Sequence, residues 1–129
     1  MRILVADDQE QVRKRICAIL TAHVDYEVCA EAANGVQAVE LARKLSPDLI
    51  VLDITMPLMN GLEAARMIRV FAPATPIVIL SVHKSKQLME EAKKVGVLGY
   101  VTKEDVVEQL TRAAELACLA KSCYPVDFS

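Results

Sequence analysis

The chain has 129 residues, of which 53% are hydrophobic and 25% are charged. This length and composition are those of one globular domain with a substantial core, without room for a second domain. The 15 basic and 17 acidic side chains give a formal net charge of −2, so composition gives no basic footprint for nucleic acid. No apolar run approaches the roughly 18 residues that span a membrane, and the N-terminus lacks a signal-peptide pattern. We expect a soluble cytoplasmic protein that binds neither nucleic acid nor membrane directly.

The four cysteines are Cys17, Cys29, Cys118 and Cys123. They show no CxxC spacing and have no neighbouring histidine, so the pattern of a zinc site is absent. We expect the first three to be reduced, small apolar packing residues, and we expect no disulfide.

The first half of the chain alternates between strand and helix patterns. A short apolar run at residues 3–6 predicts a strand, and apolar residues at helical spacing over residues 12–20 predict a helix. The second strand alternates, with Tyr26, Val28 and Ala30 on one side and polar or small residues on the other. That alternation is typical of an edge strand.

The alternation continues to the end of the chain. An Asn-Gly pair starts a helix over residues 36–45, the apolar strand 49–52 follows, and a further helix covers residues 62–70. The strand 76–81 is again apolar throughout, as expected for a strand covered on both faces.

A helix over residues 88–95, a strand over 97–101 and a helix over 106–117 complete the pattern. Five strands alternating with five helices predict an α/β fold, a (βα)5 doubly wound parallel sheet joined by right-handed crossovers. With the second strand at the edge, we expect the order 2-1-3-4-5. Winding then reverses between strands one and three, and ligands bind beyond the carboxyl ends of the strands at such a reversal.

Five polar residues follow strands at that edge of the predicted sheet: Asp7, Asp8, Asp53, Ser81 and Lys103. Three carboxylates around one crevice repel each other unless a cation or shifted pKa values relieve them. Carboxylates, a backbone carbonyl and water suit a hard divalent ion such as Mg²⁺. A hydroxyl and a lysine beside them suit a phosphoryl group. The sequence therefore predicts an acidic metal site for phosphoryl chemistry, with one of the carboxylates as acceptor.

Each of these residues also has a simpler structural interpretation. Either aspartate of the first pair could cap the first helix, and Asp53 could open a turn. Ser81 could cap the following helix, Lys103 could be a solvated surface lysine, and Tyr100 could be half-buried strand surface. The shared location of all five site residues at one edge favours the functional interpretation.

Four motifs, "ILVADDQ", "LIVLDITMPLMNG", "PIVILS" and "LGYVTK", occur in the order and spacing of a known family. The chain resembles the receiver domain of bacterial two-component response regulators, which has a flavodoxin-like fold. The resemblance covers residues 1–120, and residues 121–129 would be a C-terminal tail or the start of a linker. The sequence is similar in type to receivers that are joined to a helix-turn-helix DNA-binding output domain. The resemblance therefore implies transcriptional control.

The resemblance implies a role for each site residue. Asp53 would accept a phosphoryl group, and Asp8 and Asp53 would bind Mg²⁺ (or Mn²⁺) directly. The backbone carbonyl of Thr55 would be the third protein ligand, and Asp7 would act through bound water. Lys103 would pair with a phosphoryl oxygen.

The resemblance also implies a switch and partners. The Ser81 hydroxyl would move toward the phosphoryl group, and the Tyr100 side chain would rotate inward as Ser81 moves. The donor would be a sensor histidine kinase or a phosphotransfer protein. The fourth helix, fifth strand and fifth helix would form the face that controls homodimerisation or an output partner. Such a domain is a signalling module and not an enzyme, although it promotes its own phosphorylation and slow dephosphorylation.

Three other functions are compatible in part with the sequence, and one position departs from the family pattern. A phosphatase of the haloacid-dehalogenase type would need a second aspartate where Thr55 stands. A flavin mononucleotide module would place its phosphate against Asp7, Asp8 and Glu10, which would repel it. A pseudo-receiver that is never phosphorylated would have the same fold. Receivers commonly carry a proline with a cis peptide after the lysine, whereas Glu104 follows here, so we expect a different loop geometry.

Overall fold

The computed structural model describes residues 1–120, and the predicted tail at 121–129 lies outside the described residues. The strands are β1 (Arg2–Ala6), β2 (Glu27–Ala32), β3 (Leu49–Asp53), β4 (Ile77–Ser81) and β5 (Gly99–Thr102). The helices are α1 (Glu10–Thr21), α2 (Gly35–Leu45), α3 (Gly61–Phe71), α4 (Lys86–Val95) and α5 (Val106–Ala120), with a 3-10 turn, η1 (Lys103–Asp105), before the last.

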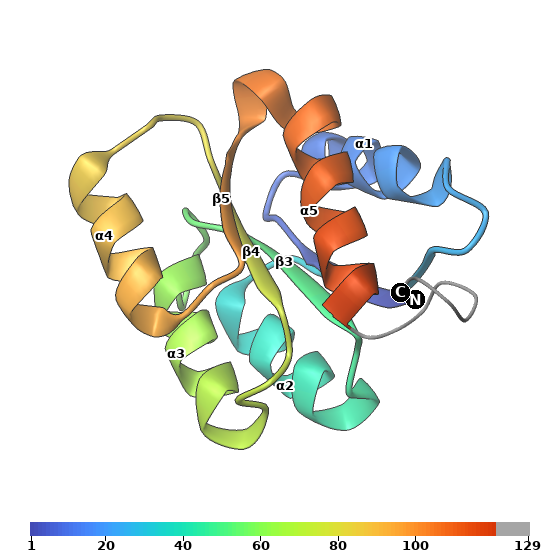
Figure 1. The fold of residues 1–129 in the computed structure, drawn as a ribbon. Coiled ribbons are helices and arrows are strands. Elements are labelled where there is room, and N and C mark those ends of the chain that lie inside the picture. The colour runs from blue at the N-terminus through green and yellow to red at the C-terminus, as the bar shows by residue number, and fades with distance from the viewer. Residues whose placement is uncertain (121–129) are drawn as a thin grey trace.

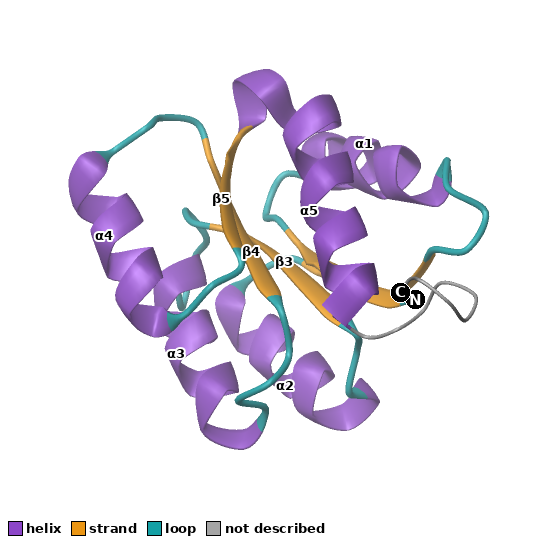
Figure 2. Ribbon diagram, in the orientation of Figure 1, coloured by secondary structure: helices purple, strands orange, loops and turns teal. Residues whose placement is uncertain are grey.

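The five strands form one parallel sheet in the order β2-β1-β3-β4-β5, which confirms the predicted topology. Helices α1 and α5 cover one face of the sheet, and α2, α3 and α4 cover the other (Figures 1 and 2). The winding reverses between β1 and β3, which are hydrogen-bonded neighbours. The carboxyl ends of β1 and β3 therefore lie side by side.

The core has two parts, one on each face of the sheet. Successive residues of a strand point to opposite faces, so the apolar strands contribute to both parts. Leu4 and Ile50 pack under α2 and α3, whereas Val5 and Val51 pack under α1 and α5, and all four side chains are fully buried. This packing on both faces fixes the positions at which β1 and β3 end.

Three helices are each preceded by an N-cap residue whose side chain accepts a backbone N–H of the first turn. Asn34 accepts from Gln37, and Ser85 accepts from Leu88. Asn60 forms a complete capping box with Glu63, in which each side chain accepts the other residue's backbone N–H. These caps fix where α2, α3 and α4 start relative to the strands before them.

The edge strand β2 departs from the predicted alternation. The pairing between β1 and β2 shifts register between Ile3 and Leu4, which is a β-bulge. Tyr26 and Val28 consequently pack on the α1 and α5 side, whereas Ala30 packs on the other side. The expectation that all three share one face is wrong at Ala30, because the extra residue at a bulge reverses the alternation.

One cysteine prediction is also wrong. Cys118, which is buried on α5, is disulfide-bonded, whereas Cys17 and Cys29 are free as expected. The prediction used the lack of CxxC spacing, which is informative about metal and redox motifs. A disulfide only requires two Cα atoms about 4.4–6.8 Å apart, whatever their spacing in sequence.

Within residues 1–120, the structure contains no helix with the length and apolar character needed to cross a membrane.

Candidate functional site

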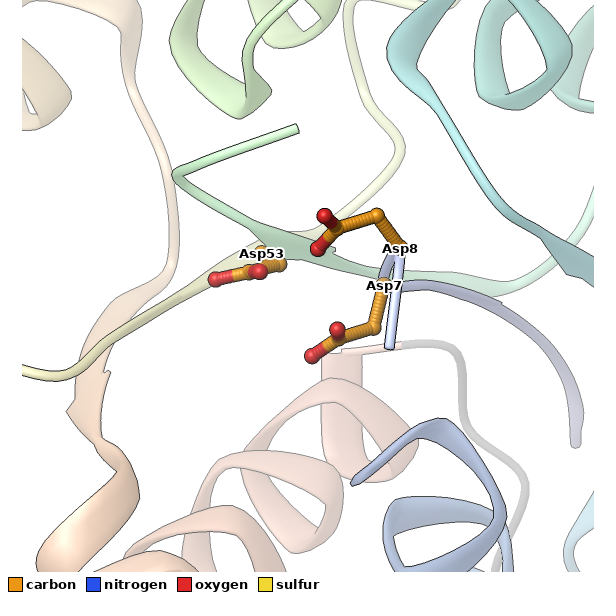
Figure 3. A group of neighbouring side chains, drawn as sticks. All are labelled: Asp7, Asp8 and Asp53. Carbon is orange, nitrogen blue, oxygen red and sulfur yellow. The ribbon is translucent and has the colours of Figure 1, made fainter. Parts of the chain in front are cut away.

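Three aspartates meet where β1 and β3 end. Asp7 and Asp8 directly follow β1, and Asp53 is the last residue of β3. One carboxylate oxygen from each lies within 4.8 Å of the others, and the three side chains extend to the same side of the sheet edge (Figure 3). Asp7 and Asp53 are 0% and 3% exposed, whereas Asp8 is exposed. The cluster therefore has a buried floor and one carboxylate open to solvent.

The backbone around Asp7 is held at several points. Its N–H donates to the carbonyl of Ala32 on β2 at 3.0 Å, and its own carbonyl accepts from Arg13 Nη1 at 2.8 Å. Its carboxylate accepts the backbone N–H of Gln9 at 2.9 Å. Gln9 is the N-cap residue of α1 and its side chain makes no capping bond, so neither aspartate of the pair occupies the N-cap position. The simpler interpretation of the pair as the helix cap is therefore wrong.

Lys103 supplies the opposite charge. It begins the 3-10 turn after β5, and its Nζ lies 3.0 Å from Asp7 Oδ2 and 3.3 Å from Asp53 Oδ1. Its side chain is 19% exposed, so it is not the solvated surface lysine of the simpler interpretation. The described residues contain no cis peptide bond, and Glu104 lies within the 3-10 turn.

Burial and repulsion act on the ionisation of Asp53. Burial and the charge of Asp7 raise the pKa of Asp53 from its usual value to about 6, against the opposing effects of Lys103 and the backbone N–H of Thr55. Burial alone would lower the pKa of Lys103, but its bonds to Asp7 and Asp53 more than compensate and raise it. One lysine thus partly neutralises two buried carboxylates, and further positive charge would be stabilised here.

The loop after Asp53 packs tightly against it. The N–H of Gly61, the first residue of α3, donates to the carbonyl of Ile54 at 3.0 Å. A Cβ on Gly61 would collide with the carbonyl oxygen of Asp53, so glycine is the residue that fits there. Thr55 is the second residue after β3 and is exposed, with its N–H directed at Asp53.

Ser81 and Tyr100 share a hydrogen-bond acceptor. The hydroxyl of Ser81 donates to the carbonyl of His83 at 2.8 Å, and the hydroxyl of Tyr100 donates to the same carbonyl at 3.1 Å. Ser81 does not cap α4, because Ser85 does so. The loop between β4 and α4 therefore connects the carboxyl end of β4 to the surface of β5.

The structure brings together the three aspartates and Lys103, and it places Ser81 buried at the adjacent strand end. Tyr100 lies on β5, and its hydroxyl donates to the His83 carbonyl, which also accepts from Ser81. Two residues of the site were not predicted from the sequence: Arg13, which donates to the carbonyl of Asp7, and His83, whose carbonyl accepts from Ser81 and Tyr100. Carbonyl contacts of this kind leave no side-chain pattern from which they could have been predicted.

Comparison with known proteins places the chain in a family. The model of the response regulator receiver domain matches residues 3–115. The chain is 33% identical over 113 residues to the transcriptional regulatory protein LnrK of Bacillus subtilis, covering 88% of this chain and 51% of that protein. It is 42% identical over 127 residues to a protein-glutamate methylesterase/protein-glutamine glutaminase of Archaeoglobus fulgidus, covering 91% of this chain and 36% of that protein.

A solved structure shows the same arrangement of elements. The LuxR-family two-component response regulator from Aurantimonas sp. superposes with a TM-score of 0.86 at 34% identity, over 94% of this chain and 85% of that one. The chain spans about half the length of the first curated relatives it matches. The chain belongs to the receiver domain family of two-component response regulators.

Proposed function

We propose that this domain accepts a phosphoryl group on Asp53 from a sensor histidine kinase or a phosphotransfer protein in the cytoplasm. The observation that carries the proposal is the pairing of Lys103 with both Asp53 and Asp7 at the edge where three carboxylates converge. A lysine in this position can remain paired with Asp7 while it contacts an oxygen bound to Asp53.

The donor atoms at this edge fit a divalent metal ion. All three side chains offer hard carboxylate oxygens within 4.8 Å of each other, and the raised pKa of Asp53 reflects charge that Lys103 alone does not neutralise. We assign Asp8 and Asp53 as direct ligands of Mg²⁺ (or Mn²⁺), with the carbonyl of Thr55 as the third and Asp7 acting through water. When bound, the ion would supply positive charge that neutralises the oxygens of the transferring phosphoryl group.

The transfer itself makes one bond and breaks one. A carboxylate oxygen of Asp53 forms the new O–P bond, the N–P bond of the donor phosphohistidine breaks, and the imidazole nitrogen keeps its electron pair. Asp53 is 3% exposed and is the last residue of β3, so the donor would approach it from the carboxyl end of the sheet. The ammonium of Lys103, 3.3 Å from Asp53, is close enough to pair with an equatorial oxygen of the phosphoryl group.

The phosphoryl group would act at a distance through Ser81 and Tyr100. Both hydroxyls donate to the His83 carbonyl, so moving Ser81 toward a new acceptor on Asp53 changes the environment of Tyr100. We propose that this changes the relative stability of two arrangements of the face formed by α4, β5 and α5. That face would then control homodimerisation or an output partner, with transcriptional regulation as the result. Slow loss of the phosphoryl group by hydrolysis would end the signal.

Intact-protein mass spectrometry tests the proposal. The wild-type chain is incubated with a small phosphodonor such as acetyl phosphate, with MgCl₂ or with EDTA. We expect a gain of one phosphoryl mass with MgCl₂, little gain with EDTA, and no gain in Asp53→Asn. The control is Asp25→Asn, which removes an exposed carboxylate in the turn before β2 and should behave like wild type. A gain that survives in Asp53→Asn would overturn the assignment by moving the acceptor to another residue. No gain in the wild type would overturn it and leave the pseudo-receiver.

A further inference from the structure

The loop that joins β3 to α3, residues 54–60, has both of its ends beside the proposed acceptor Asp53. It leaves the sheet after Asp53 and Ile54, and it closes through the bond from the Gly61 N–H to the Ile54 carbonyl at 3.0 Å. Gly61 also packs so closely on Asp53 that a Cβ would collide with the Asp53 carbonyl. The tip of this loop therefore stands at the carboxyl edge of the sheet, beside the site.

The tip carries a leucine in an unfavourable backbone conformation. Leu58 has φ +69°, and the N–H of Met59 donates to the carbonyl of Pro57 at 2.7 Å. A three-residue turn of this kind with a positive φ at its centre is the rare, strained form, which glycine or asparagine adopts at lower cost than leucine. The Leu58 side chain is 82% exposed, so packing within the domain does not compensate for this conformation.

The loop is held on both sides of Leu58. Met56 is buried in the core at 7% exposure. The backbone of Met59 lies against Gly35, where a Cβ would collide with it. Asn60 forms the capping box that starts α3. The turn is thereby fixed, and Leu58 is presented to solvent in a defined position.

We propose that Leu58 is a contact residue for the phosphodonor protein, an inference that rests on the proposed function. Any protein that brings a phosphohistidine to Asp53 must cover the carboxyl edge of the sheet, and it then covers the tip of this loop. An exposed leucine at a fixed position contributes to such a contact when an apolar surface of the donor, next to its phosphohistidine, buries it. A small phosphodonor needs no such contact, because it can reach Asp53 without covering the loop.

We expect substitution of Leu58 to affect three quantities differently. These are the stability of the fold, the reaction with a small phosphodonor and the reaction with a protein donor. In Leu58→Asn and Leu58→Gly we expect a urea midpoint equal to or above that of the wild type, because the strain is relieved. We expect phosphorylation by acetyl phosphate with MgCl₂ to keep the wild-type rate within about twofold.

The protein donors are autophosphorylated cytoplasmic portions of the histidine kinases encoded in the same genome as this chain. The kinase that phosphorylates the wild-type chain fastest is used for every variant. We expect kcat/KM for transfer to fall about tenfold in both variants, mainly through KM, which is the size of effect that losing one buried leucine side chain gives. The matched control is Val24→Asn, which removes another largely exposed apolar side chain, 92% exposed, from the turn before β2. This variant should accept the phosphoryl group at the wild-type rate.

Several results would overturn the inference. The first is an unchanged rate of phosphotransfer from the kinase to both Leu58 variants, and the second is an equal loss of rate when acetyl phosphate is the donor. The third is that no kinase tested transfers its phosphoryl group to the wild-type chain. The fourth is that the Leu58 variants differ from the wild type only in self-association. Failure of the proposed function would look different, because the wild-type chain itself would then gain no phosphoryl group from acetyl phosphate.

Discussion

Asp53 is the residue on which the electrostatics of the site converge. Its carboxylate is buried, lies beside two other carboxylates and has one lysine for partial neutralisation. Its raised pKa means that its charged form destabilises the metal-free fold. The charged form of Asp53 thus costs stability in the metal-free protein, and such a cost is common at functional sites.

Replacing Asp53 should stabilise the metal-free protein. In EDTA at pH 7.5 we expect Asp53→Asn to raise the free energy of unfolding by about 1–2 kcal/mol, because the asparagine carries no charge to repel Asp7. The folded-state pKa is raised to about 6, so the wild type loses stability as pH rises from about 4 through 6. The advantage of the variant should therefore be largest above pH 6 and disappear as pH falls toward 4.

Urea denaturation across this pH range, with Asp25→Asn as the control, measures the effect. Added MgCl₂ should stabilise the wild type and Asp25→Asn but have much less effect on Asp53→Asn. Lower stability of Asp53→Asn at pH 7.5 would contradict this view of the site.

At the scale of single elements, close packing between the end of β3 and the start of α3 sets the position of Asp53, the proposed acceptor. Gly61 lies against the Asp53 carbonyl and begins α3, whose capping box fixes its first turn. A strand end and a helix start are joined here without space for a side chain. Any shift of α3 would therefore be transmitted to Asp53.

Two glycine substitutions separate this packing from the general effect of adding a methyl group. Gly61→Ala should lower the free energy of unfolding by about 2–3 kcal/mol and slow phosphorylation, because the Cβ would overlap the Asp53 carbonyl. Gly99→Ala in β5 should have little effect, since nothing lies within 4 Å of its Cβ position. Chemical denaturation and the acetyl phosphate reaction report the two quantities. Equal stability of the two variants would exclude the tight packing described here.

At the scale of the whole molecule, the site lies at one edge of the sheet and the proposed output face lies around α4, β5 and α5. This face contains a cavity of about 420 Å³ between α4 and β5, and one of about 380 Å³ between β5 and α5. Tyr100 lines both cavities and also donates to the His83 carbonyl. Leu98 and Leu116 leave exposed apolar surface on the same face.

We expect phosphorylation to strengthen homodimerisation through this face. Analytical ultracentrifugation with and without a stable acyl-phosphate mimic should show a lower dimer Kd when the mimic is bound. Leu98→Lys should weaken that dimer without changing phosphorylation, because Leu98 borders both cavities but does not reach the site. The same degree of dimerisation with and without the mimic would contradict the proposed output.

The fold was largely predictable from the sequence, because the alternation of apolar strands and amphipathic helices determines the topology. The acidic cluster was predictable as well, since parallel strands place Asp7, Asp8 and Asp53 at one edge. The face of Ala30 was not predictable, because a bulge depends on pairing and not on composition. Contacts through backbone carbonyls were likewise hidden, as with Arg13 on Asp7. The strain at Leu58 became apparent only from its backbone angle.

The location of the phosphoryl group tests the central claim most directly. Borohydride reduces an aspartyl phosphate to homoserine, and tandem mass spectrometry of the digested protein then identifies the altered residue. After reaction with acetyl phosphate and MgCl₂, we expect homoserine at position 53, with Asp7 and Asp8 unchanged. Homoserine at another position, or unaltered Asp53 in protein that carries a phosphoryl group, would contradict the account.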